Sequence, residues 1–447
     1  MILGAFCGTM KDSILQNNDI FTQDFKNTAY WWDLVEEPQA DIELPVTKTD
    51  VVIIGSGYTG LCAGIQTARA GRETLILDAE RLGWGCSSQN GGQVSGLLKP
   101  SLADLSQKYG ADKALKILQE GANSMQFLKD FIADEGIDCD VRMNGKFRAA
   151  HNAAQYEAMA KKYTNQIKGL ELKVDMVPQS EQHREIGSAA YFGGAVIHNH
   201  FGLNPAKFHS ELVKRARSSG VKLVAYCRVE KINRQANKFL ICTSKGIIEA
   251  RDVIVATSGY TDKSLPWHRR RIIPIGSYMI TTEDLGVDVV KSIIPNDRIV
   301  TDSRKLVYYY RSSPDRRRIL FGGRVSLQET NPKVSAPLLR NELVKLFPQI
   351  LDVKISHSWM GYVDFTFDSM PHIGCHDGLY YALGYCGSGI ATASYLGARV
   401  GQKLLGDPQG MTELDDISFN TRPFYIGNPW FLAPSVHYYR WLDKSRR

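Results

Sequence analysis

The chain has 447 residues, of which 43% are hydrophobic and 23% charged, so it is neither a disordered nor a fibrous protein and must bury a large core. At about 150 residues per domain, this length allows about three units, or two domains interleaved in sequence. Lysines and arginines exceed aspartates and glutamates by 54 − 47 = +7, a mild excess that does not indicate a nucleic-acid-binding surface.

The first regular segment of the chain is a βαβ pattern. Residues 50–54 form a short β-branched run that predicts a buried strand of a parallel sheet. Residues 58–70 have helical spacing and end at Gly71, and residues 74–77 predict a second buried strand that ends at Asp78. This pattern is typical of the start of a Rossmann-like domain.

Long helices and a return to the same sheet are expected next. Residues 101–135 carry a helical pattern, with interruptions expected near Gly110 and Gly121. Another helix is predicted over 205–219. The apolar run 253–256 then predicts a further strand of the first sheet.

The second half of the chain predicts a different kind of sheet. Residues 272–330 alternate apolar and polar side chains between turns, which is typical of antiparallel strands. Residues 379–383 predict a last apolar strand, followed by a glycine-rich turn and a helix over 389–405. We therefore expect an α/β fold, with a Rossmann-like domain interleaved with an antiparallel-sheet α+β domain that binds the substrate.

The cysteines and the apolar segments indicate in which cell compartment the protein is expected. The 8 cysteines contain no C-x-x-C spacing, so no zinc ribbon or redox motif is indicated, and no metal is expected. Scattered cysteines without a signal peptide are typical of a cytoplasmic protein with reduced thiols. No run approaches about 18 apolar residues, which excludes a spanning helix. The aromatic and basic C-terminal end is expected to pack on the protein and not on a membrane.

A glycine motif follows the first strand, where nucleotides bind in Rossmann-like domains. Gly55, Gly57 and Gly60 form G-x-G-x-x-G: the first makes the turn, the second lets the backbone approach a pyrophosphate, and the third permits close helix packing. Asp78 lies 78 − 60 = 18 residues further on, near the spacing of about 20 expected for an acid that binds a ribose hydroxyl. The motif leaves open whether the dinucleotide is NAD or FAD.

The segment after Asp78 favours FAD. Residues 81–93 are a run of small and hydrogen-bonding residues, where a nicotinamide enzyme normally goes straight into a helix. The run ends in Asn-Gly-Gly-Gln (90–93) and resembles the D-amino-acid oxidase superfamily, which includes glycine and sarcosine oxidases. In that superfamily the segment passes beside the pyrophosphate and the isoalloxazine ring.

The resemblance extends from residue 50 to about 406 and is strongest to the branch that includes gamma-glutamylputrescine oxidoreductase. Residues 228–232 match the extended segment that meets the adenine. Residues 256–260 match the strand end beside the ADP moiety, although Ser258 intervenes before the glycine.

Two further matches concern the flavin ring. Residues 359–374 match the motif that lines the flavin, and residues 384–390 match the turn that opens the last helix, whose N-terminus favours negative charge near the pyrimidine edge. Noncovalent FAD is expected, because the attachment positions of some members have no matching residue here except the ambiguous Cys86. The FAD-binding residues that the resemblance implies are Gly55, Ser56, Gly57, Tyr58, Thr59, Gly60, Asp78, Ala79, Arg81, Gly85, Ser87, Asn90, Gly91, Gly92, Gln93, Val229, Thr257, Gly259, Trp359, Gly361, Gly387, Ser388, Gly389 and Ile390.

The motif order also implies a domain division. The FAD-binding domain is expected to be discontinuous, with the other parts of the chain inserted into it or placed at its ends. The expected parts are an N-terminal leader over 1–49, the FAD-binding domain over 50–140, 196–264 and 357–410, a substrate-binding domain over 141–195 and 265–356, and a C-terminal extension over 411–447.

The resemblance implies FAD-dependent oxidation of the C–N bond of an amine or amino acid. Hydride passes to flavin N5, the imine hydrolyses, and dioxygen or a quinone reoxidises the flavin. Gamma-glutamylputrescine-like amines are the leading substrates, and the alternative is a D-amino-acid or N-methyl-amino-acid dehydrogenase that uses a quinone. An alternative of another class is a non-catalytic flavin-binding or assembly protein, against which residues 359–374 argue because they organise the reactive face.

The substrate side carries weaker signals. Because the cofactor takes up the electrons, no single catalytic base is required, and side chains mostly orient the substrate. Arg311 or Arg324 is a candidate for binding a substrate carboxylate. The candidates for orienting the substrate are His200, Tyr278, Tyr309, Phe365 and Tyr385.

Overall fold

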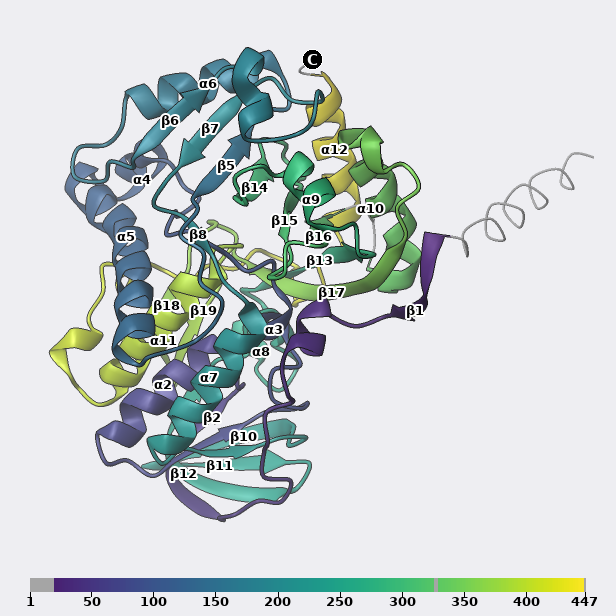
Figure 1. Ribbon diagram of the computed structural model, residues 1–447. Helices are drawn as coiled ribbons and strands as arrows, with labels where there is room; N and C mark the ends of the chain where they lie inside the picture. Colours follow the sequence, from purple (N-terminus) through teal and green to yellow (C-terminus); the bar gives the residue numbers. More distant parts are fainter. Residues whose placement is uncertain (1–19, 325–328, 446–447) are drawn as a thin grey trace, which may run out of the picture.

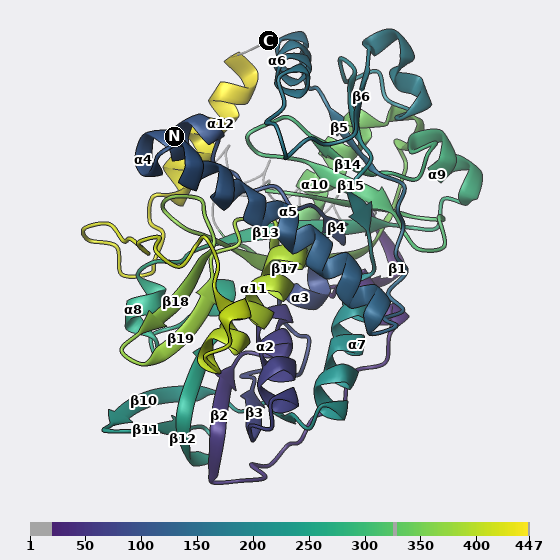
Figure 2. The ribbon, with the colours of Figure 1, turned by 90° about the vertical axis from the view of Figure 1, so that its left-hand side faces the viewer.

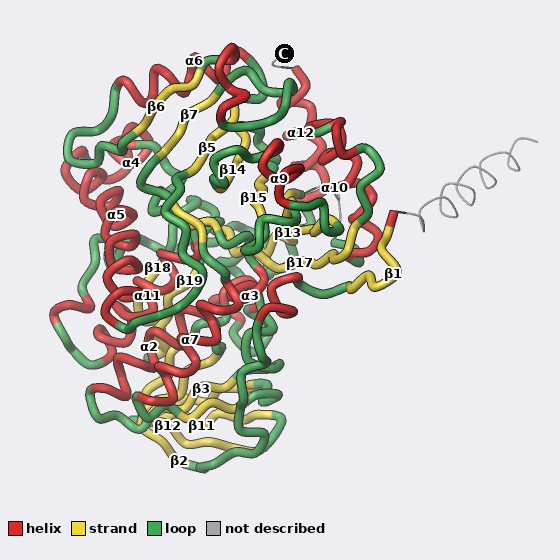
Figure 3. The backbone as a smooth tube through the Cα atoms, viewed as in Figure 1, coloured by secondary structure: helices red, strands yellow, loops and turns green. Residues whose placement is uncertain are grey.

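The computed structural model describes residues 20–324 and 329–445, which build two large β-sheets, one in the lower and one in the upper part of the view in Figure 1. The tube in Figure 3 shows the two groups of strands separately, with helices α2 (Tyr58–Arg69), α7 (Pro205–Ser218) and α11 (Gly389–Leu404) beside the lower group. Residues 1–19, the first part of the expected leader, lie outside the described residues.

The lower sheet contains the βαβ unit that the sequence predicts. β2 is parallel to both β3 and β12, and β12 is parallel to β19. The path through this sheet is β10 (Val229–Gln235), β11 (Lys238–Thr243), β12 (Gly246–Val255), β2 (Lys48–Ile54), β3 (Thr74–Leu77) and β9 (Lys222–Val224), with β19 (Leu379–Leu383) added to β12 and β18 (His372–His376) paired to β19.

Alternating side chains of β2 enter two different cores. Val51 and Ile53 pack with helices α2, α7, α11 and α5 (Ala111–Asp134), whereas Val52 and Ile54 pack with β3 and the β10–β12 strands. Both faces of the strand are therefore buried, as its continuous apolar run predicts. Figure 2 shows α5 running in front of α7 and α11.

The upper sheet is mostly antiparallel. Its path is β1 (Phe21–Lys26), β17 (Ile355–Phe365), β13 (Ile273–Thr282), β16 (Ile319–Gly323), β15 (Tyr309–Ser312), β14 (Ile299–Asp302), β5 (Lys146–Ala149), β7 (Gly194–Ile197) and β6 (Val174–Val177). Only the β1–β17 and β14–β5 pairs among these described strands are parallel. Helices α9 (Val287–Ile293) and α10 (Pro332–Leu346) pack on one face of it.

The remaining described elements lie between or after the strands of the two sheets. They are η2 (Tyr30–Leu34), α3 (Cys86–Gln89), β4 (Gln93–Val94), α4 (Leu102–Tyr109), α6 (Ala153–Thr164), η3 (Gln179–Arg184), β8 (Phe201–Gly202), η4 (Ser258–Tyr260), α8 (Pro266–Arg269), η5 (Pro348–Ile350), η6 (Pro408–Gly410) and α12 (Leu432–Ser445). Across the described residues, none of the helices combines the length and apolar character needed to cross a bilayer.

The fold class is confirmed, but one local expectation is wrong. The chain breaks at Gly110, between α4 and α5, whereas α5 continues through Gly121 without interruption. The backbone of Gly96 packs directly against Gly121, where a Cβ would clash with the carbonyl oxygen of Gly96. Gly121 therefore serves close packing and does not end a helix.

The start of the described leader is built into the upper sheet, whereas its later part reaches the lower sheet, where Asp41 bridges to Val224. Strand β1 pairs with β17, and Trp31 in η2 is fully buried in a cluster with Met279, Leu320 and Trp359. The domain boundaries stay a prediction. Strand β17 nevertheless belongs to the upper sheet, although most of it falls in the expected FAD-binding segment 357–410.

Candidate functional site

A cavity of about 260 Å³ lies at the carboxyl ends of strands β2, β3 and β12. This edge of a doubly wound parallel sheet is where nucleotides bind. The expected FAD-binding residues that line the cavity are Gly55, Ser56, Gly57, Asp78, Ala79, Gly85, Ser87, Val229 and Thr257. The structure thus brings together four segments that are distant in sequence.

The other expected FAD-binding residues lie outside the lining of this cavity. Some of them lie in helix α2, and others lie in the segment after Asp78, in η4, in β17 and at the start of α11. They are Tyr58, Thr59, Gly60, Arg81, Asn90, Gly91, Gly92, Gln93, Gly259, Trp359, Gly361, Gly387, Ser388, Gly389 and Ile390. Their contact with FAD stays a prediction.

The glycine turn leaves no room for side chains. Gly55 has a φ of +104°, and a Cβ there would lie 2.7 Å from the carbonyl oxygen of Ala256. Gly57 has an ordinary φ of −72°, but a Cβ added to it would lie 2.9 Å from Ser87 Oγ. Both glycines therefore let the turn pack closely against Ala256 and Ser87, while the backbone of the turn borders the cavity, where the dipole of α2 favours an anionic ligand.

Asp78 faces this glycine turn. Its carboxylate accepts hydrogen bonds from the N–H of Ser56 at 2.9 Å and from Ser56 Oγ at 2.6 Å. The N–H of Glu80 donates to the same carboxylate at 3.0 Å. His209 from α7 donates to the carbonyl oxygen of Ser56 at 2.8 Å. The acid is thus fixed at the cavity wall, where an acceptor for ribose hydroxyls is expected.

The segment that ends in Asn-Gly-Gly-Gln is held by two buried tryptophans. Trp31 Nε1 donates to the carbonyl oxygen of Asn90 at 2.9 Å, and Trp359 Nε1 donates to that of Gln89 at 2.7 Å. The side chain of Asn90 accepts a hydrogen bond from the N–H of Gly92 at 2.9 Å. The conformation of this segment therefore depends on both the leader and β17.

The turn before α11 is held from two sides. Gly387 has a φ of +92°, and Ser388 Oγ donates to the carbonyl oxygen of Leu97 at 2.9 Å. The buried carboxylate of Asp364 accepts a hydrogen bond from the N–H of Gly384 at 2.7 Å. These contacts fix the position of the α11 N-terminus relative to β17.

Asp364 makes the stability of the protein dependent on pH. Burial raises the pKa of Asp364 to about 6, from a usual 3.8, although the Gly384 N–H lowers it. Because the unfolded chain ionises at lower pH, the Asp364 contribution to the free energy of unfolding falls by about 3 kcal/mol between pH 4 and 6. Asp364→Asn keeps an acceptor for Gly384 and is expected to remove this dependence. Urea unfolding of both proteins from pH 4 to 7 tests it, and a difference that is constant with pH would contradict it.

The tyrosines expected to orient the substrate are all engaged by protein groups. The hydroxyl of Tyr278 donates to Glu329 at 2.9 Å, that of Tyr309 pairs with Ser277 at 2.8 Å, and that of Tyr385 pairs with Thr59 at 2.5 Å. Phe365 is half-buried, with the ammonium of Lys99 5.1 Å from its ring centroid. His200 is buried, and neither of its ring nitrogens has a hydrogen-bond partner among the described residues.

The two arginines expected to bind a carboxylate have other partners. Arg311 is buried and donates from Nη1 to the carbonyl oxygens of Gly92 at 2.9 Å and Leu203 at 2.7 Å. Arg324 Nη1 pairs with Glu329 at 2.9 Å. Arg311 thus supports the backbone beside the predicted flavin segment. Nε and Nη2 of Arg324 are buried without a hydrogen-bond partner among the described residues, so carboxylate binding by Arg324 stays a prediction.

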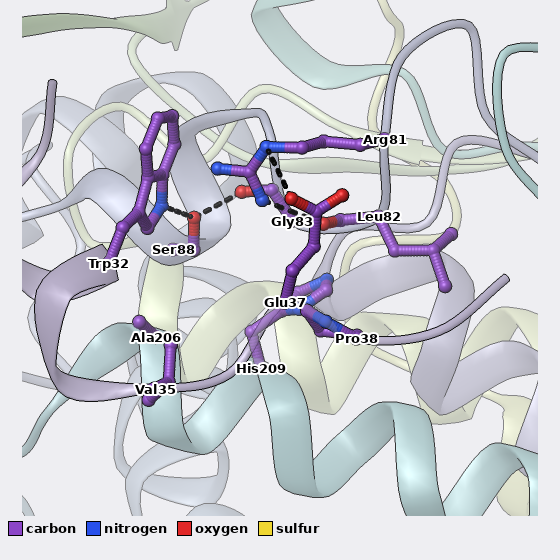
Figure 4. A pocket seen from close by; sticks show the side chains of 10 residues that line it. All are labelled: Trp32, Val35, Glu37, Pro38, Arg81, Leu82, Gly83, Ser88, Ala206 and His209. Atoms are coloured by element: carbon purple, nitrogen blue, oxygen red, sulfur yellow. Dashed lines mark hydrogen bonds and ion pairs between the residues drawn. The ribbon is translucent and has the colours of Figure 1, made fainter.

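Arg81 lies in a smaller pocket of about 80 Å³ (Figure 4). Its guanidinium lies 4.0 Å from the centroid of the Trp32 ring, and its Nε lies 3.8 Å from a carboxylate oxygen of Glu37. Gly83 and His209 line both this pocket and the main cavity. Residues of the leader therefore hold the side chain of Arg81 next to the main cavity and not inside it.

Several cavity residues were not among those expected. Arg228 bridges two acids at the cavity wall, with Nη1 3.1 Å from Asp262 and Nη2 3.3 Å from Glu80. The rings of Trp84 and Tyr260 meet edge to face, with centroids 5.6 Å apart. Arg228, Trp84 and Tyr260 lie inside the matched motifs, whereas Asp262 and Glu80 lie outside them. The sequence could therefore have indicated the first three as further cavity residues, because they are the charged and aromatic residues of those motifs.

The cavity residues fit the nucleotide part of FAD. The main chain of the glycine turn borders the cavity at the N-terminus of α2, whose dipole favours a pyrophosphate, and Asp78 supplies an acceptor at the adjacent strand end. In the described part of the chain, no three His, Cys, Asp or Glu side chains cluster so as to hold a metal ion. The cysteines between residues 20 and 445 are free thiols.

Comparison with known proteins identifies the group to which this architecture corresponds. A family model described as FAD dependent oxidoreductase (DAO) matches residues 50–402. Gamma-glutamylputrescine oxidoreductase of Escherichia coli (strain K12) is 31% identical over 362 residues, which are 80% of this chain and 84% of that protein. A probable oxidoreductase, OrdL, of Haemophilus influenzae is 29% identical over 432 residues, which are 94% of this chain and 97% of that protein.

Solved structures share the fold at low sequence identity. Glycine oxidase from Geobacillus kaustophilus superposes with a TM-score of 0.68 at 19% identity, covering 85% of this chain and 99% of that chain. L-Proline dehydrogenase from P. horikoshii gives a TM-score of 0.64 at 17% identity, covering 88% and 99%. At these identities the comparison shows the shared fold.

Proposed function

The chain belongs to the DAO family of FAD-dependent oxidoreductases, and we propose that it oxidises the C–N bond of an amine whose chemistry is like that of gamma-glutamylputrescine. FAD binding is supported by one observation: the glycine turn, Asp78, Val229 and Thr257 line the same cavity. The substrate part rests on the relative that is 31% identical over 80% of this chain.

FAD, when bound, supplies the electron acceptor for the substrate C–H bond, and the protein supplies orientation and electrostatics. The glycine turn at Gly55 and Gly57 and the carboxylate of Asp78 are proposed to hold the ADP end. The N-terminus of α11, fixed through Ser388 and Asp364, is proposed to place its positive dipole end against negative charge on the flavin.

We propose noncovalent attachment of the flavin. Cys86 lies in the segment that the family places beside the flavin, and it is the cysteine that the sequence leaves as a possible site of covalent attachment. Burial raises the pKa of the Cys86 thiol to about 12, so it remains protonated at neutral pH. Because the thiolate is the reactive form, this environment does not favour a cysteinyl linkage.

Anaerobic mixing with a panel of amines tests the substrate class. Gamma-glutamylputrescine is expected to bleach the flavin absorbance, because its oxidation reduces the cofactor. The panel should include putrescine, sarcosine, glycine and D-alanine at equal concentrations. Dioxygen or a soluble quinone is then admitted to the reduced protein in separate samples. The compound that restores the flavin colour faster is identified as the electron acceptor.

The panel can also contradict the proposal. Bleaching by D-alanine or sarcosine alone would replace the gamma-glutamylated amine with an amino-acid substrate. If no amine or amino acid bleached the flavin of a fully loaded protein, amine oxidation itself would be rejected.

A further inference from the structure

Three cations and one neutral histidine gather beside the segments that the family places at the flavin. Lys146 and Arg148 lie on β5, Lys99 follows the β4 segment, and His200 lies in the turn between β7 and β8. Burial, with the nearby charges of Arg148 and Lys99, lowers the pKa of Lys146 to about 7. Burial, with the charges of Lys146, Lys129 and Arg148, lowers the pKa of His200 to about 3. These four groups are therefore electrostatic neighbours.

The register of β5 explains why its two cations share a side. Lys146 and Arg148 are two residues apart on one strand, so their side chains leave the same face of the sheet. The alternate residues Phe147 and Ala149 are fully buried in the core beneath α9 and α10. The cations therefore leave the face away from these helices, in a strand that pairs with β7 and β14 (Figure 1).

Lys99 connects this cluster to the predicted flavin site. Its ammonium lies 5.1 Å from the ring centroid of Phe365, and its pKa is lowered by burial and by Arg148, while Cys386 opposes the change. Phe365 ends β17, and Cys386 lies in the turn before α11. The cluster thus begins where the upper sheet meets the turn of α11.

The cluster has no acidic partner of its own. Within residues 20–324 and 329–445, no carboxylate lies within 4.0 Å of the side-chain nitrogens of Lys99, Lys146 or Arg148. His200 is 1% exposed, and both of its ring nitrogens lack partners in the same part of the chain. Lys146 and Arg148 are half-buried, and Lys99 is exposed at the edge of the cluster. Half-buried like charges and a buried imidazole without partners are costly unless an anion compensates them.

We propose that Lys99, Lys146 and Arg148 bind the acidic end of the amine substrate. His200 is the buried polar partner within the same site. Because no acid neutralises the three cations, they favour a substrate whose far end carries a carboxylate or phosphate, and an ammonium group beside that acid weakens the attraction. This proposal rests on the proposed amine oxidation and deepens it: an acylated putrescine that ends in an acid alone is expected to bind more tightly than gamma-glutamylputrescine.

A matched set of amines tests the proposal by steady-state kinetics. Putrescine acylated with glutaric acid carries the acid alone, gamma-glutamylputrescine adds the ammonium, and acetylputrescine has neither. We expect the KM of the glutaryl amine to be lowest, by roughly 10–100-fold relative to the acetyl amine, as for hydrogen bonds to charged groups. Arg148→Met should remove this advantage, whereas the exposed control Lys214→Met should retain it. Equal KM values for the glutaryl and acetyl amines would overturn the proposal.

Direct binding separates this proposal from the proposed reaction. Calorimetric titration of the FAD-loaded protein with glutarate and, in parallel, inorganic phosphate needs no turnover. Binding that weakens at least tenfold in both Arg148→Met and Lys146→Met supports the acid site, and the tighter anion identifies carboxylate or phosphate. Absence of binding of either anion to a yellow, folded protein overturns the acid site even if amines bleach the flavin. Anion binding without bleaching by any amine rejects only the oxidation.

Discussion

Gly57→Leu is expected to yield a folded protein that purifies without its flavin. The φ of −72° at Gly57 suits any residue, so the backbone itself is not strained by the change. The added Cβ would lie 2.9 Å from Ser87 Oγ, which accepts the hydrogen bond from the N–H of Tyr58 at 3.1 Å, and the longer side chain would enter the cavity. The ratio of flavin to protein absorbance measures the loss, and we expect it to fall at least tenfold.

The control for this change is a glycine outside the site. Gly220, after α7, has a φ of +95° and open space around an added Cβ. Gly220→Ala is expected to reduce the free energy of unfolding by about 1 kcal/mol while keeping the flavin. A Gly57→Leu protein that retained full flavin would show that the pyrophosphate does not cross this turn.

Trp31→Ala is expected to lower the free energy of unfolding by about 3–5 kcal/mol. Trp31 is fully buried between residues of the upper sheet, and its Nε1 donates to the carbonyl oxygen of Asn90 at 2.9 Å. The substitution removes a large buried side chain and leaves that carbonyl oxygen without its indole donor. A fall in Tm, measured with the flavin-loaded protein, checks the prediction.

Trp430→Ala is the matched control for Trp31→Ala. Trp430 is 70% exposed in the C-terminal extension, so its removal is expected to change the free energy of unfolding by less than about 0.5 kcal/mol. Similar Tm values for the two variants would mean that the leader does not stabilise the body of the protein.

The sequence predicts the parts of the fold that depend on neighbouring residues. The βαβ unit and its glycine turn combine short-range signals, namely an apolar run, a turn and a helix start, so they were identified correctly. The interruption expected at Gly121 was wrong, because the reason for that glycine is a contact with Gly96 from a separate segment. A glycine in a helical pattern does not tell whether it breaks the helix or admits a neighbour.

The substrate side was less accessible to sequence reasoning for the same reason. Arg311 looks like a carboxylate ligand in sequence, but its donors are used by Gly92 and Leu203 from other segments. Lys99 and Lys146 have no motif in common, and only the fold places them in one electrostatic cluster. Residues whose role depends on pairing across the sheets need the structure.

The pairing of β1 with β17, in which Phe21 lies opposite Ile355, affects how the chain matures during synthesis. The lower sheet likewise needs β19, which ends at Leu383, beside β12. Neither sheet can therefore be completed on the ribosome until most of the chain has emerged. Strands made early keep unpaired edges during that time, and such edges associate with other chains. We therefore expect slow folding and a need for chaperones during overproduction. Both effects result from the order of the strands in the sheets and do not depend on the cofactor site.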